Sequence, residues 1–196
     1  MNLVEMRARV RQDLEDTDSA NYRWTDNEVD GAIQRVVREF SLARPIQQKN
    51  DIATTDSSTE LDISSLTGLI AVESVEFPIG EAPPYYQHFQ IWGDTIEMED
   101  EGDGSNARVR WYKEHTLDAT STTIPAQFEE IIVLGATGYL AASASAYTVD
   151  KASIAGKWAT INFLKWGDRR LELYQKKLKA ISRSNRIISR EFYGDS

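Results

Sequence analysis

Two histidines and one acidic stretch are the residues of this chain whose types suggest a catalytic or metal site. His88 follows a Pro-Pro-Tyr-Tyr turn and His115 follows a predicted strand, and neither stands at metal-ligand spacing from another histidine or a carboxylate. We therefore expect both to be surface histidines. Carboxylates crowd residues 97–103, where a divalent cation could bind. Because that run lacks the loop pattern of a calcium hand, a solvated hairpin tip is the preferred interpretation.

The motifs of common enzyme classes are missing from the sequence. There is no cysteine, which excludes disulfides, thiolate metal sites and cysteine nucleophiles. There is also no phosphate-cradling glycine loop, no Gly-x-Ser-x-Gly elbow and no dinucleotide fingerprint. We therefore expect a protein that is not an enzyme, with no catalytic residues, no bound metal and no cofactor.

The strongest local signal is a capping motif between two predicted helices. In Thr25-x-x-Glu28 the Thr25 hydroxyl can accept from the Glu28 amide, while the Glu28 carboxylate accepts from the Thr25 amide. This capping box fixes the start of the second helix. Trp24 precedes the cap, and we expect it to pack against Val29 as a hydrophobic staple. Trp24, Thr25 and Glu28 are thus predicted to form a structural corner.

Helical periodicity predicts the elements on either side of this corner. The first helix should span residues 2–15, with Arg7, Arg9 and Arg11 on its polar side, and the second should span residues 26–43. Two apolar stripes joined by a short polar loop favour an antiparallel helical hairpin.

Residues 46–122 change to short alternating runs separated by turn residues. This pattern predicts a small antiparallel sheet inserted between two helical halves. Five strands are expected, at residues 51–55, 69–77, 89–92, 95–98 and 108–112.

Two further helices are predicted in the C-terminal part. The helix that opens at Pro125 is apolar around most of its circumference, and its small residues predict a central position with close helix packing. The last helix, at about residues 150–183, would approach 50 Å, so part of it should project or pack on a neighbouring copy. Residues 184–196 interrupt the helical period but keep apolar anchors between arginines. We expect an extended tail that orders on a partner, the alternative being a strand or turn folded back on its own domain.

The expected fold class is therefore mainly α with a β insert. A bundle of about four helices is formed by residues 1–45 and 123–183, with the β-rich insertion at 46–122 and the C-terminal docking tail at 184–196. At 196 residues and 41% hydrophobic composition, the chain is long enough for one domain with a small insert. No apolar run approaches the roughly 18 to 20 residues that span a bilayer, and the N-terminus lacks a basic leader with an apolar centre, so neither export nor membrane anchoring is expected.

Charge is distributed unevenly along the chain, whose net charge is -9. Residues 1–149 hold 11 Lys and Arg against 26 Asp and Glu, whereas residues 150–196 hold 11 against 5. The basic arm could dock on an acidic partner or could be the solvated face of a long helix. Nucleic-acid binding is a further alternative, although the acidic chain and the lack of interleaved aromatic residues argue against it. The cations that would track phosphates are Lys165, Arg169, Arg170, Lys176, Lys177, Lys179, Arg183 and Arg186.

Three N-terminal segments, Val10–Leu14, Asp16–Asp18 and Tyr22–Asp26, resemble the start of head-to-tail adaptor (connector) proteins of tailed bacteriophages. The order of the later elements is similar as well: a polar β-rich middle, Ile124-Pro125 opening a small-residue helix, a long charged helix and a C-terminal tail. The insertion at 46–122 is larger than in the shortest adaptors, which is where the chain departs from their pattern.

The resemblance implies a structural virion protein of the phage neck, made in the host cytoplasm, with no membrane association. Such adaptors form a twelve-fold homo-oligomeric ring beneath the portal protein, and DNA passes through the lumen without specific binding. The next partner would be a neck stopper or tail-completion protein. The chain could itself be such a stopper, although stoppers are typically β-rich. The tail would insert against the portal through Arg183, Arg186, Ile187, Ile188, Arg190, Phe192 and Tyr193.

Overall fold

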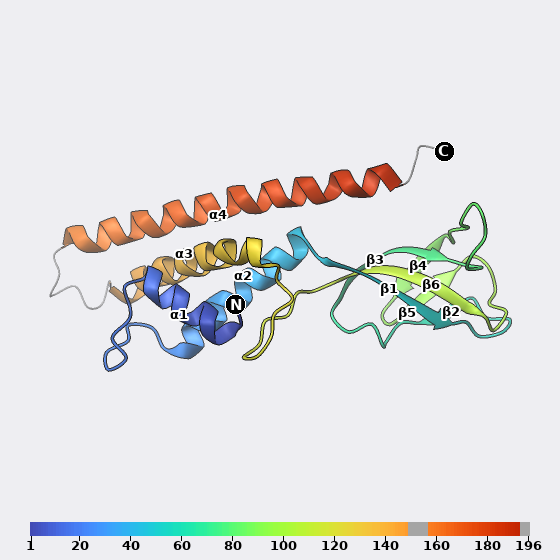
Figure 1. Cartoon of the computed structure of the whole chain (residues 1–196), viewed down its shortest axis with the longest axis horizontal. Helices are drawn as coiled ribbons and strands as arrows, with labels where there is room; N and C mark the ends of the chain where they lie inside the picture. The colour runs from blue at the N-terminus through green and yellow to red at the C-terminus, as the bar shows by residue number, and fades with distance from the viewer. Residues whose placement is uncertain (149–156, 193–196) are drawn as a thin grey trace. The chain divides into compact units, whose positions relative to one another are not determined.

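The chain divides into a helical unit and a β unit, which are described separately. The computed structural model describes the backbone of residues 1–148 and 157–192, and the side chains of residues 1–144 and 163–184. Residues Met1–Arg44 and His115–Ser196 form the helical unit, and Pro45–Glu114 form the β unit. Figure 1 shows the elements of each unit coloured along the chain.

Four α-helices and one short 3-10 helix make up the described part of the helical unit. Helices α1 and α2 each begin at a capping box, and α2 has the predicted bounds. A 3-10 turn follows Pro125 and leads into α3. The elements are α1 (Leu3–Asp13), α2 (Asp26–Ala43), η1 (Ala126–Phe128), α3 (Glu129–Thr148) and α4 (Lys157–Phe192).

Helix α3 is the central helix of this unit, as the sequence predicted. Residues 132–138 are all buried, and α3 packs against α1, α2 and α4. A Cβ at Gly138 would lie 2.8 Å from Leu171 Cδ2, and a Cβ at Gly167 would lie 2.7 Å from Ala141 Cβ. The small residues therefore allow the α3 and α4 backbones to approach closely, and α3 and α4 run side by side in Figure 1. The surrounding core includes Met6, Val10, Val29, Ile33, Val36, Phe40, Ile132, Leu140 and Tyr174.

Helix α4 is longer than its neighbours. Its 36 residues correspond to about 54 Å at 1.5 Å per residue, whereas the 20 residues of α3 correspond to about 30 Å. The predicted start near residue 150 lies among residues 149–156, outside the described part of the chain.

The prediction of an extended tail over residues 184–196 was wrong as far as Phe192, because α4 continues to that residue. Residues 184–193 contain no proline or glycine, so nothing in the backbone chemistry stops the helix at residue 183. Ile181, Ile188 and Phe192 also recur at helical spacing, a pattern that the intervening arginines obscure in the sequence.

Six strands form two three-stranded antiparallel sheets in the described chain, instead of the single sheet of five strands that was predicted. The strand expected at 51–55 is observed at 46–53, and a three-residue strand, too short to show alternation, was missed. One sheet has the order β1 (Ile46–Ala53), β6 (Asn106–Lys113), β3 (Leu69–Glu76), and the other has the order β2 (Glu60–Asp62), β5 (Thr95–Met98), β4 (Phe89–Trp92).

The β unit has its own core, because alternate residues of its strands face inward. Val109 and Trp111 of β6 are buried, while Arg108 and Arg110, which alternate with them along the strand, are half-buried on the other face, as predicted. The core comprises Leu61, Ile63, Leu66, Val75, Phe77, Ile96, Met98, Ala107, Val109 and Trp111.

The β unit ends earlier than the sequence suggested. Its last residue is Glu114, whereas the insertion was expected to reach residue 122. Leu117 is buried in the helical core, and its carbonyl accepts from Gln34 Nε2 at 2.9 Å. Residues 115–122 therefore form part of the helical unit, held by α2.

Candidate functional site

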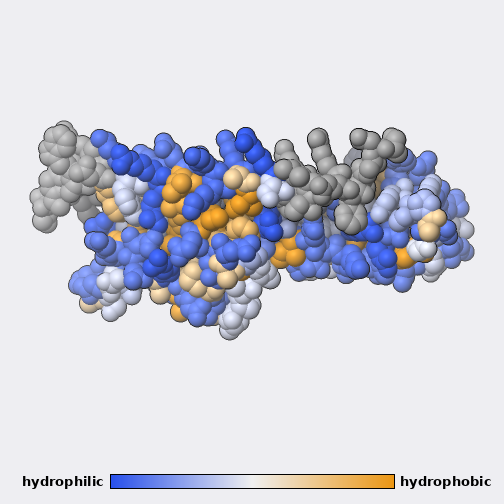
Figure 2. Space-filling model, turned by 45° about the horizontal axis from the view of Figure 1, so that its top comes forward, coloured by the Kyte–Doolittle hydropathy of each residue, from blue (hydrophilic) through white to orange (hydrophobic). Residues whose placement is uncertain are grey.

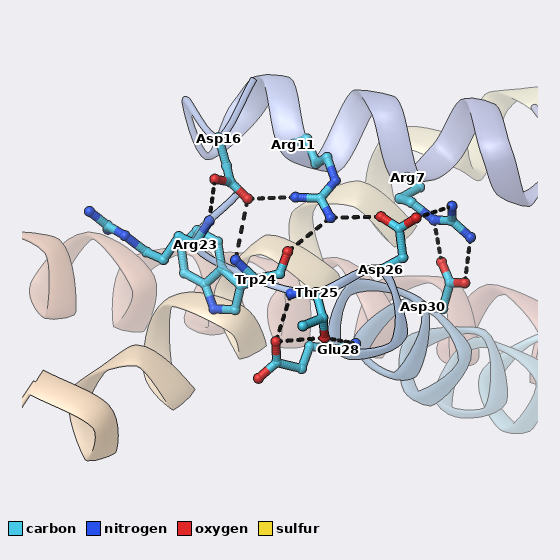
Figure 3. A network of polar contacts seen from close by, with 9 residues as sticks. All are labelled: Arg7, Arg11, Asp16, Arg23, Trp24, Thr25, Asp26, Glu28 and Asp30. Carbon is cyan, nitrogen blue, oxygen red and sulfur yellow. Dashed lines mark hydrogen bonds and ion pairs between the residues drawn. The ribbon is translucent and has the colours of Figure 1, made fainter. Parts of the chain in front are cut away.

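The capping box expected at Thr25 and Glu28 is formed. Thr25 Oγ1 accepts from the Glu28 amide at 3.3 Å, and Glu28 Oε2 accepts from the Thr25 amide at 2.7 Å (Figure 3). The hydrogen bond from the Thr25 amide holds the pKa of Glu28 below its usual value. This exchange fixes the first turn of α2 and the direction in which the loop enters it.

Arg11 lies at the centre of an ion-pair network at the same corner (Figure 3). Its guanidinium donates to Asp16 at 2.6 Å, to Asp26 at 2.7 Å and to the Trp24 carbonyl at 2.9 Å. The hydrogen bond from Arg11 lowers the pKa of Asp26. The prediction that Arg11 lies on the polar side of the first helix was wrong, since only 4% of it is exposed. The loop after α1 folds back over Arg11 and supplies the 7% exposed Asp16 as its partner.

Trp24 connects this corner to α4. Its ring stacks on Phe163 with centroids 6.2 Å apart, and Phe163 stacks on Trp166 at 5.6 Å. The Arg23 guanidinium lies 5.4 Å from the Trp24 ring and 5.6 Å from the Phe163 ring. Trp24 and Val29 belong to the same buried cluster, but the stacking partner of Trp24 is on α4. The corner therefore packs against the N-terminal half of α4. The spacing of residues around Trp24 in the sequence does not indicate this contact.

Arg170 also ties α4 to its neighbours. It donates to Asp13 of α1 at 2.6 Å and to the Thr137 hydroxyl of α3 at 2.7 Å, and its guanidinium lies 4.7 Å from the Trp166 ring centroid. Including Arg170 among the cations that would track phosphates was wrong, because a carboxylate of its own unit neutralises it.

Glu39 gathers side chains from three helices. It accepts from Tyr139 of α3 at 2.8 Å, from Tyr174 of α4 at 3.0 Å and from Arg35 of its own helix at 3.2 Å. Tyr174 is fully buried. Burial, followed by the Glu39 charge, raises the pKa of Tyr174 far above its ordinary value, and burial likewise raises the pKa of Tyr139.

Replacing Tyr174 by Phe should make the free energy of unfolding fall less steeply above about pH 10. The unfolded chain releases the tyrosine proton near its ordinary pKa of 10.0, while the raised pKa keeps that proton on the folded protein. The stabilisation is therefore fully present below about pH 10 and is lost as the pH rises further, at up to about 1.4 kcal/mol per pH unit for one proton. Urea unfolding from neutral pH to about pH 11 measures this slope.

The wild type should show the steeper fall above pH 10, and Tyr174→Phe should also cost about 1 kcal/mol at neutral pH through the lost hydrogen bond. Tyr85→Phe, at a 49% exposed site, serves as the control and should leave the slope unchanged. Equal slopes for the wild type and Tyr174→Phe would contradict the assignment.

The outer side of α4 carries a line of exposed cations. Gly167, Tyr174 and Ile181 lie on the side of α4 that faces the core, and residues 165, 169, 172, 176, 179 and 183 recur on the opposite side. Figure 2 shows hydrophilic residues along its upper edge, over α4, and hydrophobic residues gathered below that edge. Where side chains are described, none of the lysines and arginines at these outer positions is in an ion pair. The outer line is defined as Lys165, Arg169, Lys176, Lys179 and Arg183, with Glu172 as its one acidic position.

The predicted docking residues lie at the end of α4. Arg183 is exposed, and Tyr193 falls outside the described chain. Five more of them belong to α4, although their side chains lie outside the described part of the chain: Arg186, Ile187, Ile188, Arg190 and Phe192.

The two histidines differ from each other. His88 is exposed, as predicted, but His115 is buried, so that prediction was wrong for His115. The end of α2 and the segment before α3 enclose its ring: Nε2 lies 2.9 Å from the Arg44 carbonyl and Nδ1 lies 3.2 Å from the Thr123 hydroxyl. Burial lowers the pKa of His115. Its contacts make it a structural residue of the helical unit.

Two carboxylates of the acidic stretch 97–103 make hydrogen bonds within the β unit. Asp100 accepts from Gln87 Nε2 at 2.8 Å, and Asp103 accepts from the Ser105 amide at 2.9 Å. Among the described residues, no group of three or more His, Cys, Asp or Glu side chains is placed to hold a metal ion.

Comparison with protein-family models and with curated proteins finds no match for this chain. In the described chain, no helix is both long enough and apolar enough to cross a bilayer. The functional argument therefore depends on how the helical unit holds α4 and on what α4 presents.

Proposed function

We propose that this protein is a structural component of the neck of a tailed bacteriophage, an adaptor ring that joins the portal vertex to the tail or to the next neck component. The resemblance of the N-terminal segments supports this function. So does the order of elements, in which we propose a bundle of about four helices with a β insertion between the second and third. The role requires association with protein partners and no covalent chemistry.

The single observation that carries the proposal is the length of α4. Ile181 is the last described side chain that packs against the helical core, yet α4 continues to Phe192. The sequence beyond Ile181 alternates arginines with isoleucine and phenylalanine. Isolated short helices are marginal in water, and a helix end with apolar residues is best explained by a surface that receives it. In the proposed ring that surface belongs to the portal protein.

Charge supports the second part of the role, the passage of DNA. A duplex carries about one negative charge per 1.7 Å and adheres to cationic walls. A chain with a net charge of -9 can line a channel without binding the DNA that passes through it, provided that the cations of α4 face protein partners. Ring closure by head-to-tail contacts also requires two different faces on each protomer.

Deleting residues 184–196 should abolish binding to the portal while leaving the protein folded. The deleted residues follow the last described contact with the helical core, so the thermal midpoint should change little. Co-sedimentation with the portal protein of the same genome measures binding, and circular dichroism measures folding. A shorter truncation that removes only residues 194–196 is the matched control and should bind. Portal binding by the long truncation would contradict the proposal, and its unfolding would assign the segment to the core.

A further inference from the structure

The two units differ strongly in charge. The β unit contains 4 Lys and Arg against 14 Asp and Glu, a net charge of -10, and the helical unit contains 18 against 17, a net charge of +1. Two arginines of the β unit are already paired, Arg108 with Asp51 at 2.8 Å and Arg110 with Glu76 at 3.0 Å. The excess carboxylates therefore remain on the surface of the β unit.

Some of these carboxylates share one face of the sheet β2-β5-β4. Leu61 and Ile96 are buried beneath it, so their neighbours along each strand point outward. Glu60 stands directly opposite Glu97, and like charges in that position destabilise a sheet. A cationic partner would relieve that repulsion.

An exposed aromatic residue lies on the same face. Trp92 is opposite Thr95, two residues from Glu97, and is 71% exposed. A tryptophan beside carboxylates suits lysine and arginine side chains, because the ring face attracts the same cations as the carboxylates. We define the acidic face as Glu60, Asp62, Glu97 and Trp92.

The outer line of α4 has matching chemistry. It runs about 27 Å from Lys165 to Arg183, and cations three or four residues apart are separated by about 4.5 to 6 Å along the axis. Outward residues of a strand repeat at about 6.7 Å. The outer line lies opposite the side of α4 that packs on the core, so a partner can reach it without disturbing the helical unit.

We propose that the outer line of α4 docks on the acidic face of a second copy of this chain. The inference rests on the proposed ring and names the two different faces that a head-to-tail contact needs. The chain itself carries the complementary surface, which favours a second copy as the partner. Duplex DNA is disfavoured because the β unit, with its net charge of -10, repels a polyanion approaching the chain.

Reciprocal charge reversal tests this pairing. The line variant carries Lys176→Glu, Lys179→Glu and Arg183→Glu, and the face variant carries Glu60→Lys, Asp62→Lys and Glu97→Lys. Sedimentation velocity at low salt should show self-association of the wild type, which high salt weakens. Each variant alone should associate about a hundredfold more weakly, because like charges then meet at the contact. An equal mixture of the two variants should recover association, since every contact again joins opposite charges.

A matched control carries the same change in net charge at exposed positions outside the outer line. Arg38→Glu, Lys49→Glu and Lys177→Glu together should leave self-association unchanged. Circular dichroism should show all variants folded. A wild type that stays monomeric at low salt would overturn the inference, as would a control variant that loses association to the same extent.

Three outcomes separate this inference from the proposed function. If the line variant and the face variant both associate as strongly as the wild type, the copies meet through other faces. That result overturns the pairing but is compatible with the ring. Loss of retention on duplex DNA by the line variant, without loss of self-association, assigns the line to nucleic acid and overturns the pairing. A protein that self-associates as described but does not bind the portal rejects the adaptor function and keeps the interface.

Discussion

Replacing Arg11 by Ala should cost the protein about 3 to 5 kcal/mol of folding stability, the usual penalty for removing one partner of a buried ion pair. The Asp16 carboxylate, 7% exposed, would lose its cation while remaining enclosed. It would keep the Arg23 amide as a donor at 2.7 Å, but an amide does not neutralise it. The Trp24 carbonyl would lose its donor as well. Urea unfolding followed by circular dichroism measures the loss.

Arg9→Ala on the same helix is the matched control for Arg11→Ala. The Arg9 side chain is 38% exposed, and its carboxylate partners Asp13 and Glu130 stand at 3.8 and 3.7 Å. Its removal should therefore cost less than about 1 kcal/mol. The double change Arg11→Ala with Asp16→Ala removes the orphaned charge and should recover part of the loss. A cost for Arg11→Ala no larger than that for Arg9→Ala would show that the network does not hold the corner.

The same corner shows which features of this fold are readable from the sequence. The bounds of α2 and its capping box were predicted correctly because they depend on residues three and four apart. The burial of Arg11 was missed because its partners come from the loop beyond α1, and an amphipathic pattern treats every arginine as solvated. The stacking of Trp24 on Phe163 was missed for a related reason, since it joins segments that are distant in the sequence.

The candidate site was predictable to a similar extent. The cations of α4 are visible in the sequence, and most of those named as a phosphate-tracking stripe are exposed. Among those whose side chains are described, Arg170 is the exception, because Asp13 and Thr137 reach it from other helices. The end of α4 was misjudged because arginines between apolar residues resemble a tail, although no backbone breaker stops the helix. Packing between distant elements is the information that a single sequence does not contain.

Three contacts explain how α4, which extends beyond the helical core, can present a defined surface. Phe163, Arg170 and Tyr174 attach α4 to the corner, to α1 and to Glu39 respectively. Each attachment uses the side of α4 opposite the outer line. A rigidly held helix fixes the direction of its free end and of its cations, which lowers the entropy cost of docking either of them.

Replacing Gly167 by Ala should destabilise the protein by about 1 to 3 kcal/mol, although Ala is the better helix former. The new methyl group would lie 2.7 Å from Ala141 Cβ, and neither side chain can rotate away, so α3 and α4 must separate. The same substitution at Gly31, an exposed position of α2 with no atom within 4 Å of the new methyl group, should instead stabilise by about 0.5 to 1 kcal/mol. Thermal and urea unfolding of the two variants test the opposite signs. Stabilisation by Gly167→Ala would mean that the two backbones are farther apart than described, and the rigid attachment of α4 would lose its basis.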